Sequence, residues 1–390
     1  MQIRRLLRQY YVNSVIINSS TLLMAVLVFL LSYPYFIWQT KIASLVLPVA
    51  FLFLLGHRRK NHLDILMLVV FFLLYFYAAF RGPFTIMGSI TVSFLWILFF
   101  ADKSFLYSSF CIYKTIFSVS LIPAILCFIV VVCGVDLPYH DIPSFNTIKD
   151  GTYRVYPFFV MYEEIIGFPM LRFNAYYDEP GLLGTISAIL LISDKCSLRH
   201  KENIPIFIAG FLSLSLFFYV ILGMYFFIFA SVKKKIVSFM VVILALVLLS
   251  TNEYLKDNFF VRFAISGNKF AGDTRTNISY DVWFQNFIQT HEALWGLGGD
   301  FASRKNLGGA SYKDLIVTYG FVFFITYILA FMRFFYICNK YFLCFLVCVF
   351  TFACVLYQRP SVTDFFYVFL FCGLAYTLSL KTIEKNKDGE

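Results

Sequence analysis

The chain has 390 residues, of which 60% are hydrophobic and only 14% are charged, and its mean hydropathy is +0.78. Because soluble proteins carry about a quarter charged residues, this composition excludes a soluble globular protein and indicates a polytopic membrane protein. The net charge of +10 does not point to nucleic acid, since a chain embedded in a bilayer exposes too little surface for that partner.

Apolar runs dominate the chain from its N-terminal to its C-terminal part. A helix needs ~20 apolar residues to cross the ~30 Å core of a bilayer, and fewer if it is short or re-entrant. The runs predicted as membrane helices lie at about 14–33, 41–56, 62–80, 84–100, 115–133, 180–193, 204–231, 236–250, 312–332, 341–357 and 362–380. The sequence therefore predicts an all-α integral membrane protein formed by one multi-span domain, residues 1–390.

Lysine and arginine residues gather in the short connections between these runs. They are Arg4, Arg5, Arg8, Arg58, Arg59, Lys60, Lys103, Lys195, Arg199, Lys201, Lys233, Lys234, Lys235, Arg333, Lys340, Lys381, Lys385 and Lys387. Since short cytoplasmic loops are enriched in basic residues, these connections and both termini are predicted to face the cytoplasm.

The run at 204–231 conflicts with this charge rule if it forms a single span, because Lys233–Lys235 would then face outward. Two short, tilted or re-entrant pieces that break near Ser213–Ser215 restore the rule. This interpretation gives about twelve spans and places the two long polar loops, 134–179 and 251–311, on the same extracytoplasmic face.

Both long loops carry basic residues, which short loops on that face would avoid. They are Lys149, Arg154, Arg172, Lys256, Arg262, Lys269, Arg275, Arg304 and Lys305. Long loops escape the charge rule, so a solvated loop surface accounts for any one of them. Together with Asp178, Glu179, Asp273 and Asp300, however, they favour an anionic ligand at the outer face of the membrane.

The first loop contains four prolines among aromatic residues, which predicts an ordered but irregular cover rather than a long helix. It ends on Asp178-Glu179-Pro180-Gly181, where Pro180 suits the first turn of the next helix and the acids precede its positive end. One interpretation is that Asp178 or Glu179 simply caps this helix. Capping does not explain two adjacent acids with Arg172 upstream.

The second loop predicts an interfacial helix at about 278–288, with apolar residues on one face around Trp283. A glycine-rich stretch follows between Gly296 and Gly309. These glycines suit turns, and they also allow close backbone approach to a substrate. No Cys-x-x-Cys pair, histidine cluster or phosphate-binding glycine loop is present in the sequence, so neither a metal nor another cofactor is expected.

Over about 165–330 the motifs resemble the bacterial O-antigen and capsule polymerase and ligase superfamily. They are Arg172, Glu179-Pro180-Gly181, a Ser-x-Ser at 213–215, Arg275, Trp283, Gly296-Leu297-Gly298, Ser311-Tyr312-Lys313-Asp314-Leu315 and Tyr319-Gly320. Many ligases carry His-Asn where Gly309-Ala310 stands here, and this difference favours a polymerase. The resemblance also implies a membrane architecture similar to that of the GT-C glycosyltransferases.

The resemblance implies a glycosyltransferase that joins polyprenyl diphosphate-linked oligosaccharide repeat units outside the cytoplasmic membrane of a bacterium. Such a reaction needs guanidinium groups to hold a diphosphate and a carboxylate to accept a proton. We expect Arg172 and Arg275 to grip the diphosphate and Glu179, with Asp178 as its substitute, to act as the base. Further substrate contacts are expected from Arg154, Arg304, Asp300, Tyr312 and Trp283.

The product is an O-antigen, a capsule or another exopolysaccharide, and the sequence does not distinguish among them. Expected partners are the lipid bilayer, a flippase and a chain-length regulator. Two other functions remain open at this stage: an O-antigen ligase, and a lipid-linked oligosaccharide flippase or transporter. A transporter generally places ionisable residues inside its spans, where this chain offers little beyond Lys114.

Overall fold

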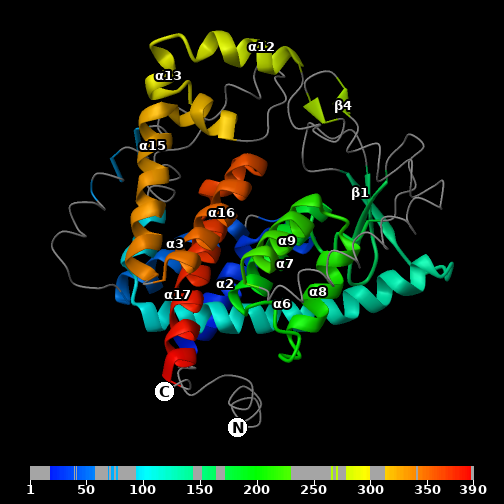
Figure 1. Ribbon diagram of the computed structural model, residues 1–390. Coiled ribbons are helices and arrows are strands. Elements are labelled where there is room, and N and C mark those ends of the chain that lie inside the picture. Colours follow the sequence, from blue (N-terminus) through cyan, green and yellow to red (C-terminus); the bar gives the residue numbers. More distant parts are fainter. Residues whose placement is uncertain are drawn as a thin grey trace.

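The computed structural model describes the following residues, to which all structural statements refer: 18–38, 40, 42–57, 69, 72–73, 76–77, 94–143, 152–163, 172–229, 265–266, 269–270, 278–298, 312–339 and 341–387. The described chain is mostly helical (Figure 1). Its α-helices are α2 (Ser19–Leu31), α3 (Ile42–Gly56), α6 (Lys103–Val132), α7 (Pro180–Ser193), α8 (Asn203–Leu212), α9 (Leu216–Phe229), α12 (Ile278–Phe287), α13 (Glu292–Trp295), α15 (Tyr312–Cys338), α16 (Phe342–Gln358) and α17 (Phe365–Lys387). Short 3-10 helices are η1 (Tyr35–Ile37), η2 (Phe94–Phe100) and η4 (Pro360–Thr363).

Two of the described helices, α6 and α15, are long and apolar enough to cross a membrane. Several shorter apolar helices accompany them, among them α7, α8, α9 and α16. The predicted runs at 62–80 and 84–100 lie largely, and the run at 236–250 wholly, outside the described residues. The number of twelve spans therefore stays a prediction.

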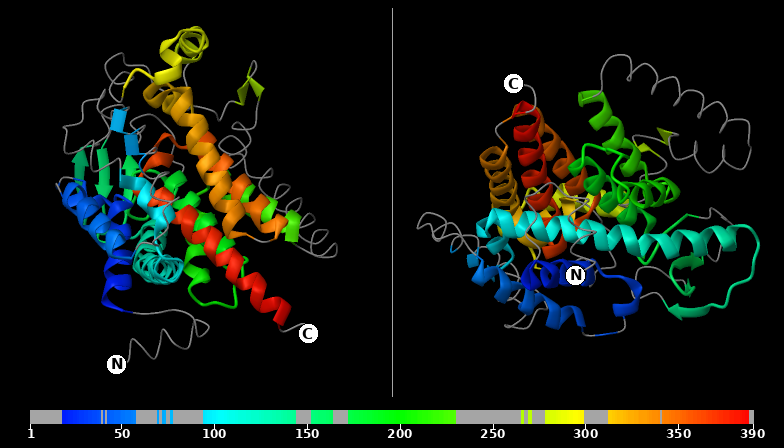
Figure 2. Two further views of the ribbon diagram at one scale, coloured as in Figure 1. Left: turned by 90° about the vertical axis from the view of Figure 1, so that its left-hand side faces the viewer. Right: turned by 90° about the horizontal axis from the view of Figure 1, so that it is seen from below.

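Helices α7 and α17 occupy the centre of the molecule. Every residue of α7 from Leu183 to Ser193 is buried, as is α17 from Phe365 to Leu378. Helix α6 crosses the molecule and separates α2 and α3 from the other helices (Figure 2, right). In contrast, large apolar side chains are exposed on the outward faces of the peripheral helices, such as Leu126 of α6 (59%) and Phe227 of α9 (73%).

The first long loop is more regular than the sequence predicts. Strands β1 (His140–Pro143), β2 (Thr152–Val155) and β3 (Val160–Glu163) form an antiparallel sheet in which Tyr153 lies opposite Ile142 and Tyr162. The prediction of an irregular cover is wrong for these residues, because alternating burial along β2 gives the loop its own apolar face. Strands β4 (Ile265–Ser266) and β5 (Lys269–Phe270) form a second, two-stranded sheet.

The run at 204–231 folds as two helices, and the predicted break at Ser213–Ser215 is confirmed. Helices α8 and α9 form a hairpin: Phe207 packs near Phe218, and the Tyr219 hydroxyl donates a hydrogen bond to the carbonyl of Phe211 (2.9 Å). Tyr225 near the end of α9 lies close to Cys196, which follows α7. The hairpin therefore returns to the end of the molecule from which α8 starts, as the charge rule requires.

The expected helix after residue 278 is confirmed as α12, but its apolar face does not point away from the protein. Tyr280, Phe284 and Phe287 are buried against the first turns of α15, whereas Val282 is exposed. Helix α15 is interrupted at Gly320, whose φ of 82° lets the backbone of α13 approach without a clash. The arrangement holds α12 and α13 at one end of α15 (Figure 1).

Candidate functional site

The strongest candidate site lies where the first turn of α7 meets the end of α16. Arg359, the residue after α16, forms an ion pair with Glu179 in which Nη1 and Oε2 are 2.5 Å apart. Glu179 occupies the N-cap position of α7, but its side chain makes no capping hydrogen bond. Since the carboxylate is directed to Arg359 instead, helix capping does not explain this acid.

Gly181 explains why the sequence has Glu-Pro-Gly at this point. Pro180 opens α7 at a position where its missing N–H is not needed. A Cβ on Gly181 would collide with the guanidinium of Arg359. The absence of a side chain at residue 181 thus lets the guanidinium lie over the first turn of α7, beside Glu179.

The electrostatic surroundings of Arg359 are acidic and shielded. Its side chain is 11% exposed. Burial alone would lower the pKa of the guanidinium, but Tyr367, Glu179 and Asp178 together raise it above its ordinary value. Arg359 is therefore a permanent cation held in a partly dehydrated place, where it interacts with anions more strongly than in water.

Asp364 lies between η4 and α17. Its side chain is exposed to solvent, and desolvation by the surrounding protein raises its pKa to about 7. Tyr367 lies within electrostatic range of Asp364 and also of Arg359, Glu179 and Asp178.

The segment before Glu179 is buried and fixed by tyrosines. The hydroxyl of Tyr177 contacts Ser32 Oγ at 3.0 Å, and that of Tyr176 contacts Ser120 Oγ at 2.9 Å. The Tyr153 hydroxyl, from β2, donates to the carbonyl oxygen of Asp178 (3.2 Å). Helices α2 and α6 and the three-stranded sheet thus set the position of both acids.

The guanidinium of Arg172 lies at the turn between α8 and α9, and Ser213 and Ser215 of this turn approach Gly184 of α7. The Arg172 guanidinium donates hydrogen bonds to the carbonyl oxygens of Ser213 (3.1 Å) and Leu214 (3.4 Å). These carbonyls belong to the turn between α8 and α9, where Leu214 has a φ of 49°. Arg172 therefore caps the turn of the hairpin, and the structure brings Arg359 into contact with Glu179.

Arg154 lies on β2, opposite Asp141 of β1, and its guanidinium stacks 4.7 Å from the centre of the Tyr139 ring. Beside it is an open groove of about 350 Å³, lined by Tyr35, Pro138, Tyr139, His140, Val155, Tyr156 and Pro157. Exposed aromatic faces with a nearby guanidinium suit a sugar ring that carries hydroxyl or acidic groups.

The expected substrate residues of the second loop are divided. Arg275, Asp300 and Arg304 lie outside the described residues. Trp283 stacks on Phe287 of its own helix (5.2 Å), and Tyr312 opens α15 with its ring near Phe324 and Tyr357. Two hydrogen bonds of 2.5 Å connect α12 to α15, one from Tyr280 to Asp314 and one from Lys313 to Asp281.

Sequence reasoning missed Arg359, although a signal was present. Arg359 lies in the short connection between the predicted runs at 341–357 and 362–380, which the charge rule places on the outer face. An arginine is disfavoured in a short connection on that face. This exception could have identified Arg359 as a residue with a specific role.

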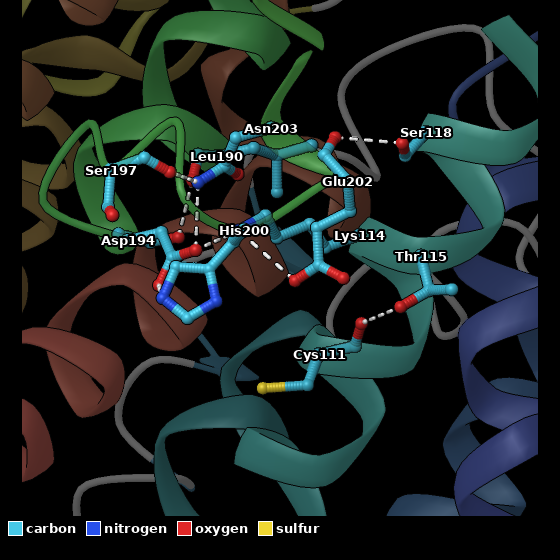
Figure 3. A network of polar contacts seen from close by, with 11 residues as sticks. Cys111, Lys114, Thr115, Ser118, Leu190, Asp194, Ser197, His200, Glu202 and Asn203 are labelled. Atoms are coloured by element: carbon cyan, nitrogen blue, oxygen red, sulfur yellow. Dashed lines mark hydrogen bonds and ion pairs between the residues drawn. The ribbon is translucent and has the colours of Figure 1, made fainter. Parts of the chain in front are cut away.

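A second polar cluster lies at the other end of α7 (Figure 3). The ammonium of Lys114, from α6, is 2.8 Å from Asp194 Oδ2 and 3.7 Å from Glu202 Oε1. Asn203 donates from Nδ2 to the same Asp194 oxygen (2.8 Å). Asp194, Glu202 and the partly exposed His200 are close enough together to bind a metal ion. Because the Lys114 ammonium already lies against both carboxylates, we interpret the cluster as a structural link between α6, α7 and α8.

Comparisons with models of known protein families, with curated proteins and with solved structures found no match.

Proposed function

We propose that the protein is a membrane glycosyltransferase that polymerises polyprenyl diphosphate-linked oligosaccharide repeat units at the outer face of a bacterial cytoplasmic membrane. The observation that carries the proposal is the ion pair between Glu179 and Arg359, with Asp178 within electrostatic range of the guanidinium, at the ends of helices that are otherwise apolar. A glycosyl transfer from a diphosphate lipid needs a fixed cation for the leaving group and a carboxylate for the acceptor hydroxyl.

Membrane residence is supported by the outward faces of the helices. Soluble monomers rarely expose large contiguous apolar patches. Here α6 exposes apolar residues along one side, including Val119, Ile122, Leu126 and Ile129, and α9 and α16 do so as well. Lipid tails would cover these faces, while both termini would lie on the cytoplasmic side.

In the proposed site, Arg359 binds the diphosphate of the donor, and Arg275 and Arg304 remain candidates to assist it. The groove beside Arg154 and Tyr139 would receive sugars of the growing chain. It is connected to the acids through Tyr153, which hydrogen-bonds the Asp178 backbone. Arg172 is assigned to the hairpin turn on which α7 packs.

The proposal is tested by deleting the gene and restoring it from a plasmid, with surface polysaccharide separated by size. Loss of the ladder with a single repeat unit remaining on its anchor supports a polymerase. An unmodified lipid core would instead identify a ligase, and lipid-linked units trapped on the cytoplasmic leaflet would identify a flippase. Arg359→Lys should not restore the ladder, because a lysine cannot replace the planar fork of a guanidinium. Arg333→Lys, an equivalent change at the predicted cytoplasmic end of α15, should restore it.

A further inference from the structure

The open groove of about 350 Å³ beside Arg154 is formed by two parts of the chain that are distant in sequence. Tyr35 comes from η1, whereas residues 138–140 and 155–157 include the paired ends of β1 and β2. The Tyr35 hydroxyl donates a hydrogen bond to the carbonyl of Pro157 (3.4 Å), so η1 is joined to the sheet at the groove. The volume lies within the range of roughly 300–1,000 Å³ that is usual for ligand pockets.

The aromatic rings of the groove are held in place by the packing behind them. Tyr156 is only 5% exposed and stacks on Phe159, with 4.7 Å between the ring centres and 6° between the ring planes. Phe159 in turn contacts Phe128 of α6 edge to face (5.7 Å). Tyr139 contacts Tyr156 at 5.6 Å and remains 49% exposed. The groove is therefore preorganised, so a ligand that covers Tyr139 does not have to order this surface first.

The chemistry of the groove favours sugar rings over a diphosphate or a polyprenyl chain. Among the residues that line it, only His140 can carry a positive charge. Arg154 lies beside the groove, opposite Asp141 of β1, with its guanidinium over the Tyr139 ring (4.7 Å). A diphosphate is bound by several charge-assisted donors, and a polyprenyl chain needs a long apolar surface. A sugar ring instead offers an apolar face to an aromatic ring and hydroxyl groups to the polar rim.

The groove is also close to the ion pair between Glu179 and Arg359. The backbone N–H of Tyr35, which lines the groove, donates a hydrogen bond to the carbonyl of Tyr176 (2.8 Å). Tyr176 precedes Glu179 by three residues. Because an extended chain spans at most ~3.6 Å per residue, the Cα atoms of Tyr176 and Glu179 are no more than ~11 Å apart. A short oligosaccharide can therefore extend from the ion pair to the groove.

We propose that this groove is a glycan subsite, separate from the diphosphate site, and that its affinity for sugar rings sets how long the product becomes. The role in chain length rests on the proposed function. Tyr139 and Tyr156 supply the aromatic surface, and His140 and Arg154 supply the polar rim. A chain that has grown past the ion pair fills the groove and dissociates more slowly between additions. A single repeat unit gains less from the groove, so the first coupling depends on it less.

Binding is measured first, because it does not depend on the reaction. The probe is a lipid-free fragment of the parent strain's own surface polysaccharide, released by mild acid and titrated into the full-length protein in nanodiscs by calorimetry. The variants are Tyr139→Ala, which removes the exposed ring, and Tyr139→Phe, which keeps it. Phe158→Ala is the matched control, since Phe158 is 52% exposed in the same sheet but does not line the groove. Size-exclusion chromatography confirms that each variant is folded.

Tyr139→Ala should raise the dissociation constant of the fragment roughly tenfold, because an aromatic face is lost. Tyr139→Phe should stay within about twofold of the parent, since the ring remains, and Phe158→Ala should bind as the parent does. In the deletion strain, a plasmid carrying Tyr139→Ala should restore a ladder of shorter chains, with the product of the first coupling still present. Tyr139→Phe and Phe158→Ala should restore the parent ladder. Should Tyr139→Ala fail to fold, oxidative footprinting of the parent decides: protection of Tyr139 by the fragment supports the subsite, and equal labelling overturns it.

Failure of this inference differs from failure of the proposed function. If the parent does not bind the fragment, or if Tyr139→Ala binds it as tightly as the parent, the groove is not a glycan subsite. Shorter chains from Tyr139→Ala without any loss of glycan binding would instead indicate that a protein partner contacts the groove. Lost binding with a parent-like ladder would refute the role in chain length. If the fragment binds through Tyr139 but deletion of the gene leaves the ladder unchanged, the proposed polymerase function is wrong and the subsite stands.

Discussion

Replacing Lys114 by methionine should destabilise the protein more than any exposed lysine substitution. The side chains of Lys114, Asp194 and Glu202 are only 3%, 2% and 8% exposed. The substitution leaves Asp194 and Glu202 facing each other without the ammonium between them. Removing one partner of a buried ion pair costs about 3–5 kcal/mol, which would lower the unfolding midpoint by roughly 10 °C.

Thermal unfolding of the purified protein, followed by intrinsic fluorescence in one detergent, measures this loss of stability. Lys201→Met changes an exposed lysine in the connection between α7 and α8, and its free energy of unfolding should stay within ~0.5 kcal/mol of that of the parent.

A double variant separates the ion pair from simple loss of packing. Asp194→Asn combined with Lys114→Met removes both opposite charges, so the double variant should be more stable than the two single effects added together. The expected coupling is about 1–3 kcal/mol. Strict additivity, or a Lys114→Met midpoint equal to that of Lys201→Met, would show that the cluster does not hold α6, α7 and α8 together.

Three further substitutions test the outer end of the molecule. Gly181→Ala should displace the Arg359 guanidinium and reduce polymer formation at least tenfold, whereas Gly223→Ala, which faces open space, should not. Equal polysaccharide ladders from the two variants would refute the close approach of Arg359 to Gly181. Arg172→Met should lower stability by about 1–3 kcal/mol, because carbonyls of the hairpin turn lose their donors; reduced turnover with an unchanged unfolding midpoint would restore its role as a clamp. Gly320→Ala should destabilise the contact between α13 and α15, since Gly320 has a φ of 82° and a Cβ there meets backbone atoms. A variant whose second loop resists protease as well as that of the parent would contradict this expectation.

Local features of the chain were predictable where a sequence pattern is compatible with only one local structure. Helix α7 runs from Pro180 to Ser193, as its apolar run and opening proline predict. The break near Ser213 followed from charge alone, because Lys233–Lys235 had to return to the side of the other basic connections. In contrast, the predicted run begins at 115, whereas α6 begins at Lys103 and includes Lys114. The ammonium of Lys114 is paired with Asp194 and Glu202, which lie far away in the sequence.

Long-range pairing is what the sequence could not specify. Glu179 was recognised as important, but its partner Arg359 lies 180 residues further along the chain. Arg172 hydrogen-bonds the backbone of the turn between α8 and α9, and its role as a diphosphate clamp stays a prediction. An arginine satisfies carbonyl oxygens and carboxylates equally well as a donor, so the residue type alone does not distinguish a structural guanidinium from a substrate-binding one.

Both polar clusters are attached to the same helix, and this links stability to the proposed reaction. Glu179 precedes α7 and Asp194 follows it, so 14 helical residues, or about 21 Å, separate the two ends. Because α7 is buried and closely packed along nearly its whole length, a shift at one end of the helix moves the other end as well. The ion pair between Asp194 and Lys114 of α6 therefore fixes the position of α7 along its own axis. The distance between Glu179 and Arg359 depends on this position. A substitution at Lys114 should consequently weaken polymer formation even though it lies at the opposite end of the helix from the proposed site.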